Sequence, residues 1–357
     1  MAWLTGYGFR KKITISTTNV DADLTSFPVY IPIVNDTDIG GEALSTGYDV
    51  RFTSSDGETE LYQERLGFAV AGGSANGDFY VRVPTVDGDA NTDIYCYYDK
   101  ADATDVSNGQ NVFQTAEGWR AVWHLEESAH PYLDATANNN DSASATTPTR
   151  VAGKIGYGQD FQGTSPGYQH IHIADSDSLD LGTGDFSISL WFNVEAVNVE
   201  QYLFDKVGTE YWYVEINNTA GTLRGAIYDG THSRSVTSSA INASTWYHGC
   251  VTCDRDSSTG FNVYIDGAWT TASNPTNVES AITNTAEAMI GAKSTDYSKG
   301  TDGIIDEIRM WGEVKGPEWI KFEFYNSHDG HAAGNELTWA GEEAGGAAES
   351  NVLYMII

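Results

Sequence analysis

The sequence lacks long apolar runs, and it has few basic residues and few cysteines. No segment reaches the roughly 18 consecutive apolar residues of a membrane-spanning helix, so no membrane insertion is expected. Its 19 lysines and arginines face 50 aspartates and glutamates, giving a formal net charge of −31. Because nucleic-acid binding requires a basic surface, nucleic acid is not an expected partner.

The N-terminus lacks the order of residues found in a secretory signal. In "MAWLTGYGFRKKITI" the aromatic residues precede the basic ones, which is the reverse of a signal peptide. The sequence therefore predicts a protein that stays inside until lysis or assembly, or that leaves by an unusual route.

The three cysteines are Cys96, Cys250 and Cys253. The last two form a C-x-x-C motif, which can indicate zinc or redox chemistry. They lie in "WYHGCVTCD", a predicted strand in which positions i and i+3 face opposite sides, and no second pair exists. Buried, inert cysteines are the favoured interpretation.

Acidity of this degree suits a solvated, salt-tolerant exterior such as halophiles use. An ordinary acidic soluble protein is an equal alternative.

Aromatic residues reach 12%, and apolar residues recur at period two in short runs separated by Gly, Asp and Asn. Examples are "KKITIST" and "FYVRVP" in the first part, and "FSISLWFNV" and "FNVYIDGAW" in the second. This pattern is typical of strands in sandwiches. The fold class is therefore predicted as all-β, with two β-sandwich domains.

We place the domain boundary near residue 118, with an anchoring or structural domain at 1–118 and a second domain at 119–326. Residues 327–357 form a tail that ends in the apolar run "VLYMII". An apolar end is protected if it adds a strand to a neighbouring subunit's sheet, so a homo-oligomer is expected. The alternative is a tail that folds back onto its own domain.

The segment "GIIDEIRMWG", residues 303–312, predicts a strand that carries an ionisable group in an apolar row. By alternation, Ile304, Asp306 and Ile308 share one face. Glu307 and Arg309 then share the other face, where they predict a surface ion pair.

Several motifs carry a family resemblance: "WHLEES", "LDATANNND", "GKIGYGQDFQG", "LDLGTGDFSISLWF", "VYIDGAW" and "GIIDEIRMW". In this order they resemble laminin-G-like domains of the concanavalin A-like jelly-roll superfamily, over about residues 119–325. The N-terminal part, with "GYGFRKKITI" and "GYDVRFTSSDG", is similar to an uncharacterised β domain that often precedes such domains in bacterial, archaeal and viral surface proteins. The resemblance implies a two-sheet jelly roll that recognises glycans or proteins, often with one structural calcium.

The resemblance also implies where calcium would lie. "LDATANNNDS" matches the family's D-x-S-G-N-x-N turn, with Ala137 in place of glycine. In the family fold this turn lies near the "IDE" strand, so calcium is expected at Asp134, Asn138, Asn140 and Asp306. The alternative is an aspartate hydrogen-bonded to the backbone and to an arginine, with no ion.

The enzyme reading finds no support in the motifs. Retaining glycosidases of the wider superfamily carry paired glutamates on one strand, at a spacing this chain lacks. Asp306 and Glu307 are adjacent and point in opposite directions, and no G-x-S-x-G elbow appears. A non-catalytic protein is expected.

The histidines give one weak metal signal. His170 and His172 share a strand face and could bind a metal, although plain sandwich surface is favoured. His124 and His248 lie in strand runs at family landmarks and are interpreted as packing residues.

Sugar recognition combines an aromatic platform with a few polar groups. The candidate ligand-binding residues are Trp212, Tyr228, Asp229, His232 and Tyr297. Trp212 has a strong alternative, since it could equally be buried on its strand.

These observations predict a non-enzymatic virion surface protein of a tailed virus, such as a spike, fibre, turret or capsid decoration. It would bind host cell-surface glycans and contact other virion proteins through its N-terminal domain. The alternative is a secreted or cell-surface microbial adhesin, located outside the cell, and a glycoside hydrolase is third.

Overall fold

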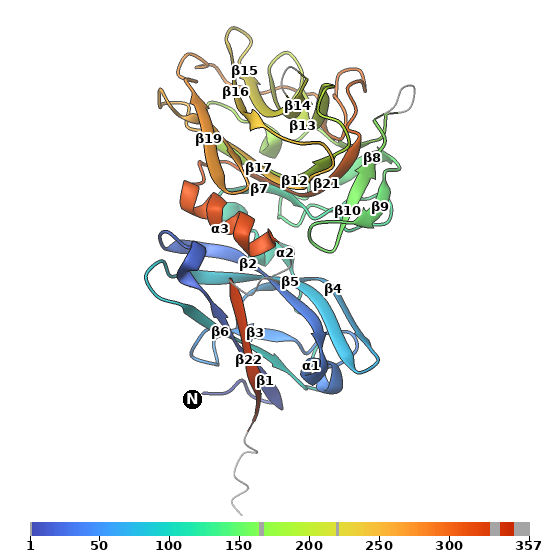
Figure 1. Cartoon of the computed structure of the whole chain (residues 1–357), viewed down its shortest axis with the longest axis vertical. Coiled ribbons are helices and arrows are strands. Elements are labelled where there is room, and N and C mark those ends of the chain that lie inside the picture. Colours follow the sequence, from blue (N-terminus) through green and yellow to red (C-terminus); the bar gives the residue numbers. More distant parts are fainter. Residues whose placement is uncertain (1, 164–167, 219–220, 329–335, 346–357) are drawn as a thin grey trace, which may run out of the picture. The chain divides into compact units, whose positions relative to one another are not determined.

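The computed structural model describes residues 2–163, 168–218, 221–328 and 336–345, and it is all-β apart from short helices (Figure 1). The chain divides into two compact units. The first comprises Met1–Ser107 together with Gly334–Ile357, and the second comprises Asn108–Ala333. The boundary after Ser107 therefore lies eleven residues before the predicted boundary near residue 118. The described C-terminal residues, 336–345, belong to the first unit.

The first unit contains two antiparallel sheets, a four-stranded one in the order β22-β1-β6-β3 and a three-stranded one in the order β2-β5-β4. Their strands are β1 (Phe9–Ile15), β2 (Leu24–Asp36), β3 (Arg51–Thr53), β4 (Gln63–Ala71), β5 (Ser74–Val86), β6 (Thr92–Tyr98) and β22 (Leu337–Ala344). Phe52 of β3 meets Phe79 of β5 edge-on at 5.4 Å, which joins the two sheets. The unit also carries α1 (Thr37–Glu42) and the short turn η1 (Thr17–Asn19).

The C-terminal strand β22 pairs with β1 of the same chain, from Phe9 opposite Ala344 to Ile15 opposite Leu337. This part of the predicted tail thus forms the edge strand of its own N-terminal sheet. The run "VLYMII", residues 352–357, lies outside the described residues.

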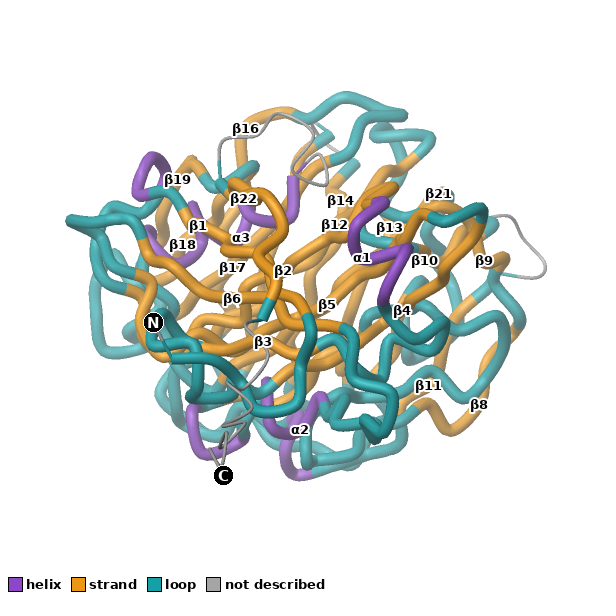
Figure 2. The backbone as a smooth tube through the Cα atoms, turned by 90° about the horizontal axis from the view of Figure 1, so that it is seen from below, coloured by secondary structure: helices purple, strands orange, loops and turns teal. Residues whose placement is uncertain are grey.

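The second unit is a jelly roll of two facing sheets, many of whose strands are labelled in Figure 1. Figure 2 colours the strands of both units orange. Sheet C has the order β19-β18-β17-β12-β21-β10-β9, with β7 also paired to β21. Its strands are β7 (Trp119–Trp123), β9 (Thr149–Ala152), β10 (Tyr157–Phe161), β12 (Phe186–Val194), β17 (Tyr247–Cys253), β18 (Phe261–Ile265), β19 (Ala268–Ser273) and β21 (Gly303–Trp311).

Sheet D faces it with the order β16-β15-β14-β13-β20-β11-β8. Its strands are β8 (Ser142–Thr146), β11 (His170–Ile173), β13 (Gln201–Val207), β14 (Tyr211–Asn217), β15 (Thr222–Tyr228), β16 (Ser233–Ala240) and β20 (Ala288–Ile290). Short helical elements complete the unit: α2 (Gly109–Val112), η2 (Thr115–Glu117), η3 (Asp177–Leu179) and α3 (Pro317–Ser327).

One large apolar core fills the space between sheets C and D. Trp123 of β7 packs edge-on against Phe204 of β13 at 5.4 Å, and Phe204 packs against Trp212 of β14 at 4.8 Å. The indole N–H of Trp212 donates to the carbonyl of Leu179 at 3.0 Å, so this buried polar group is satisfied. The core fixes which face of each strand points outward.

Helix α3 covers the outer face of sheet C. It begins at Pro317, a favoured first-turn position, and runs for 11 residues. Ser189 and Trp191 of β12 donate to Glu323 and Ser327 of the helix at 2.9 and 3.0 Å. None of the helices in the described residues combines the length and the apolar character that crossing a membrane requires.

Candidate functional site

The outer face of sheet D is set by alternation along β14. Trp212, Val214 and Ile216 point into the core, so Tyr211 and Tyr213 point away from it. Residues that pair directly with Tyr211 and Tyr213 on the neighbouring strands therefore lie on the same outer face.

Three cross-strand pairs of β14 and β15 lie on this outer face. They are Tyr211 opposite Tyr228, Tyr213 opposite Ala226, and Glu215 opposite Arg224. On β16, Ser233 and Ser235 continue the same rows.

A cavity of about 500 Å³ opens at this face, within the range typical of small-ligand sites. Its lining comes from β14, β15, β16 and the end of β19, where the edges of sheets D and C meet. The lining residues are Tyr211, Tyr213, Arg224, Ala226, Ser233, Arg234, Ser235, Ser273 and Asn274.

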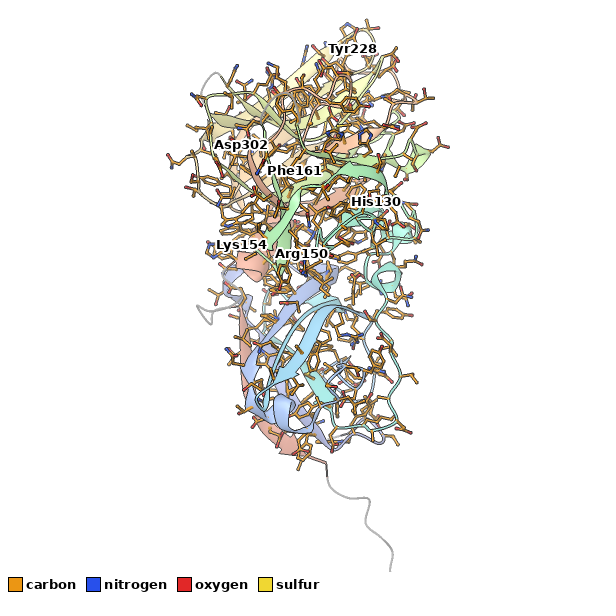
Figure 3. The ribbon with its side chains drawn as sticks, turned by 90° about the vertical axis from the view of Figure 1, so that its right-hand side faces the viewer. His130, Arg150, Lys154, Phe161, Tyr228 and Asp302 are labelled. Carbon is orange, nitrogen blue, oxygen red and sulfur yellow. The ribbon has the colours of Figure 1, made fainter. Side chains whose placement is uncertain are left out.

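Tyrosine rings form a continuous ladder whose two middle members, Tyr211 and Tyr213, belong to the lining of this cavity. Tyr228 stacks on Tyr211 at 5.1 Å, Tyr211 stacks on Tyr213 at 5.6 Å, and Tyr213 meets Tyr202 at 5.0 Å. Burial raises the pKa of Tyr213 to about 12, so its hydroxyl stays neutral. Figure 3 labels Tyr228, which lies at the end of β15. The ladder offers flat apolar faces with hydroxyls at their rims.

Two guanidinium groups stand beside the ladder. Arg224 donates through Nη2 to the hydroxyl of Tyr213 at 3.1 Å and forms an ion pair with the buried Glu215. Arg234 donates to the carbonyls of Asn274 and Ser233 at 2.9 and 2.7 Å. Burial raises the pKa of Glu215 to about 7, although Arg224 opposes this shift.

The structure scatters the five predicted ligand residues. Trp212 is 1% exposed and belongs to the core, so the alternative interpretation holds for it. Asp229 is buried and accepts the backbone N–H groups of Thr231, His232 and Ser280, which organises a loop. Tyr228 stacks on Tyr211 of the cavity lining.

The remaining two candidates are not among the lining residues, although His232 directly precedes Ser233 of the lining. His232 is exposed in the loop after β15. Tyr297 is 46% exposed and stacks on His170 at 5.0 Å, beside β11.

Sequence reasoning missed Tyr211, Tyr213, Arg224 and Arg234. The first two could have been found, because an inward Trp212 in "EYWYVEIN" forces both neighbouring tyrosines outward. The arginines carry no local signal, because their meeting depends on strand pairing and on the edge of sheet C.

The predicted calcium ligands do not form one site. Asp134 already accepts five hydrogen bonds of 2.9–3.0 Å, all from protein donors. These donors are the N–H groups of Val122, Thr136 and Asn140, the hydroxyl of Thr136 and the side-chain amide of Asn140. The amides of Asn138 and Asn140 both donate to the carbonyl of Arg120, at 2.8 and 3.0 Å.

Asp306 does not join this turn. Its Oδ2 accepts the N–H groups of Lys154 and Ile155, at 2.7 and 3.0 Å, from the turn between β9 and β10 (Lys154 is labelled in Figure 3). Gly153 permits this approach, because a Cβ there would lie 2.6 Å from the same oxygen. Among the described residues, Asp134 and Asp306 therefore accept hydrogen bonds from different segments, and neither accepts one from an arginine as the alternative required.

The expected faces of β21 also need correction. A bulge at Glu307, which has φ 51°, shifts the register between Ser189/Arg309 and Trp191/Asp306. Ile305, Ile308 and Met310 consequently face the core. Asp306 and Glu307 both lie outside that apolar row.

Glu307 and Arg309 do pair, at 2.8 Å, but they are buried and not on the surface. Glu307 also binds His124 at 2.7 Å, and Arg309 binds Glu323 of α3 at 2.9 Å. Strand alternation alone would leave Glu307 and Arg309 on an exposed face, but helix α3 covers that face. Burial raises the pKa of Glu307, but the charges of His124 and Arg309 outweigh it, so the net shift is downward.

The histidine pair and the C-x-x-C motif were the other possible metal-binding motifs. His170 and His172 lie with ring centroids 4.7 Å apart, and their Nδ1 atoms contact the carbonyl of Tyr168 and the carboxylate of Glu287. No group of three or more His, Cys, Asp or Glu side chains suited to a metal occurs in the part of the chain that the structure describes. Burial raises the pKa of both Cys250 and Cys253, which agrees with inert thiols.

Comparisons with known families agree with the two units. Residues 162–321 match the model of the concanavalin A-like lectin/glucanases superfamily, and residues 46–124 match a domain of unknown function, DUF2341. The resemblance and the all-β fold class predicted from the sequence are thereby confirmed. No curated protein matches the chain.

Solved structures are similar to part of the chain at low identity. The binding domain of Paraclostridial Mosquitocidal Protein 1 is 15% identical with a TM-score of 0.50, over 59% of this chain and 52% of that one. The botulinum neurotoxin serotype G binding domain is 12% identical with a TM-score of 0.47, over 58% and 50%. Domain 4 of AbnA, an arabinanase from Geobacillus stearothermophilus solved with arabinotriose, is 16% identical with a TM-score of 0.45, over 57% and 97%. The match spans about half the length of the two toxin binding domains.

Proposed function

We propose that the concanavalin A-like unit of this chain is a non-catalytic carbohydrate-binding module, and that its sugar binds in the cavity on the outer face of β14–β16. The observation that carries this proposal is the ladder of Tyr228, Tyr211 and Tyr213 along that cavity. Sugar rings present apolar C–H faces that pack on aromatic rings, while their hydroxyls need hydrogen-bonding groups at the rim. Ser233, Ser235 and Asn274 supply such groups.

The same cavity offers no arrangement for hydrolysis. Glycosidases place two carboxyl groups on either side of the scissile bond. The lining contains neither aspartate nor glutamate, and Glu215 lies buried with Arg224 beside it. Binding without cleavage is therefore the function that the geometry supports.

The proposal extends to the setting of the protein. An uncharacterised β domain followed by a laminin-G-like domain is an arrangement of surface proteins, so we propose display on a virion surface with a host glycan as partner. The N-terminal unit would contact other virion proteins. The genes that flank this one test the setting, since capsid, portal or tail genes are expected there and their absence would favour a cellular adhesin.

The binding function is tested by a glycan array with the wild-type protein and the variant Tyr211→Ala. The wild type should bind a defined set of glycans, and Tyr211→Ala should weaken that binding roughly tenfold, about 1.4 kcal/mol. Tyr62→Ala is the matched control, because Tyr62 is 52% exposed, belongs to the first unit and is not one of the lining residues. Equal binding by Tyr211→Ala, or no glycan binding by the wild type, would contradict the proposal.

A further inference from the structure

Charge distinguishes the cavity from the rest of the protein. Acidic residues outnumber basic ones 50 to 19 in the whole chain. The nine lining residues nevertheless include two of the ten arginines and no acidic residue. A positive cavity in so acidic a protein indicates a ligand of the opposite charge.

Arg234 is a cation without a carboxylate partner among the residues that the structure describes. Some other exposed or half-exposed cations do have a carboxylate partner, for example Lys12 with Asp93 at 3.0 Å and Lys299 with Glu200 at 3.4 Å. Arg234 donates through Nε to the carbonyl of Asn274 and through Nη1 to the carbonyl of Ser233. These bonds hold the side chain in one position before any ligand arrives, which lowers the entropy cost of binding.

Arg224 supplies the second positive charge from the neighbouring strand β15. Its hydrogen bond to Tyr213 fixes the guanidinium beside the tyrosine ladder. A planar guanidinium binds the two oxygens of a carboxylate or sulfate with matching geometry, which a neutral hydroxyl cannot offer.

Glu215, the ion-pair partner of Arg224, is only partly ionised near neutral pH. Burial raises the pKa of Glu215 to about 7, so near neutral pH part of the protein carries Arg224 without an ionised partner. The charged or titratable groups around Glu215 are Arg224 on β15, Tyr213 on β14, Tyr202 on β13 and Glu200 before β13. Arg224 is thus available to an anion from outside.

We infer that the sugar bound in this cavity carries an acidic group, a carboxylate or a sulfate, which Arg224 and Arg234 bind while the ring packs on the tyrosine ladder. This inference rests on the proposed carbohydrate-binding function and adds the class of sugar to it.

Two matched sets of glycans test the inference. One set is lactose, 3′-sialyllactose and 3′-sulfolactose, and the other is trigalacturonic acid and its methyl ester. At least one acidic member should bind tenfold or more tightly than its neutral counterpart. The sialyl and galacturonic arms identify a carboxylate, and the sulfo arm identifies a sulfate.

Variants assign the preference to the cavity. Arg234→Gln should reduce the affinity for the acidic glycan to near the affinity for its neutral counterpart. Because the side chain of Arg234 is exposed, misfolding would be a poor explanation for the loss. Lys12→Gln removes the same charge in the first unit and should leave the preference intact.

The outcomes separate the two proposals. Neutral and acidic members that bind equally, with both lost in Tyr211→Ala, would overturn the acidic-sugar inference and leave the binding function standing. A preference that Arg234→Gln does not change would also overturn the inference. No binding of any glycan, on this set or on the full array, would overturn both.

Discussion

Glu215 is fully buried two residues after Tyr213 on the outer face of β14, and its carboxylate forms an ion pair with Arg224. Burial raises its pKa to about 7, so it is mostly protonated at pH 6 and mostly ionised at pH 8. When Glu215 ionises, it competes with an acidic sugar for Arg224.

The affinity for an acidic glycan should therefore fall severalfold as the pH rises from 6 to 8, measured by titration calorimetry. Glu215→Gln should flatten this dependence, since a neutral amide cannot compete. A wild-type affinity that is constant over this range, or that rises, would contradict the competition.

Asp205 of β13 is a second buried carboxylate, and burial raises its pKa to about 8. Below pH 4 the folded and unfolded chains both hold this proton. Between pH 4 and 8 the unfolded chain releases it while the folded chain keeps it, so this residue lowers the free energy of unfolding as the pH rises. Above pH 8 its contribution levels off.

Asp205→Asn should remove this contribution to the pH dependence. At pH 8 the free energy of unfolding of the variant should exceed that of the wild type by more than it does at pH 4, by on the order of a few kcal/mol. The asparagine oxygen can still accept the N–H of Ser294, which now donates to Asp205 at 3.0 Å. Urea unfolding of both proteins at the two pH values measures the difference. Parallel pH dependence in the two proteins would show that Asp205 titrates normally.

Asp306 and Glu307 show what a residue pattern can and cannot predict. That an ionisable group in "GIIDEIRMW" would be buried was correct. Its direction was wrong, because period two assumes a regular strand and the bulge at Glu307 adds one residue. Nothing in the local sequence announces the bulge, since it depends on pairing with β12.

At the scale of elements, β22 joins the first unit through β1. Leu337 is 4% exposed and lies opposite Ile15, whereas the adjacent Thr338 is exposed. Leu337→Ala should destabilise the first unit by about 2–3 kcal/mol, because the substitution leaves a cavity. Thr338→Ala on the same strand should change stability by no more than about 0.5 kcal/mol.

Calorimetric unfolding of the two variants measures this difference. The unfolding transition that shifts in Leu337→Ala should belong to the first unit, with the transition of the jelly roll unchanged. Equal effects of the two substitutions would contradict the pairing of β22 with β1.

Most strands could be predicted from apolar alternation, but β22 could not. Its sequence "LTWAGEEA" is rich in Ala, Gly and Glu, so its propensity for strand is low. Pairing with Phe9–Ile15, more than 300 residues earlier, makes it a strand. Long-range pairing of this kind also hides the arginines of the cavity from sequence reasoning.

At the scale of the whole molecule, the net charge of −31 opposes folding through self-repulsion. Salt reduces the range of this repulsion from about 10 Å at 0.1 M to about 3 Å at 1 M. The urea midpoint should therefore rise as sodium chloride increases from 0.1 to 1 M, as expected for a protein of a saline environment. A midpoint that stays constant or falls would remove the support for a halophilic setting.

The central claim is that a sugar binds on the outer face of β14–β16, and a crystal structure with the tightest glycan from the array tests it most directly. The account predicts a sugar ring packed on Tyr211 and Tyr213, with its acidic group about 3 Å from the guanidinium of Arg224 or Arg234. A sugar ordered elsewhere, for example beside the 57% exposed Trp269 of β19, with the cavity empty, would contradict it.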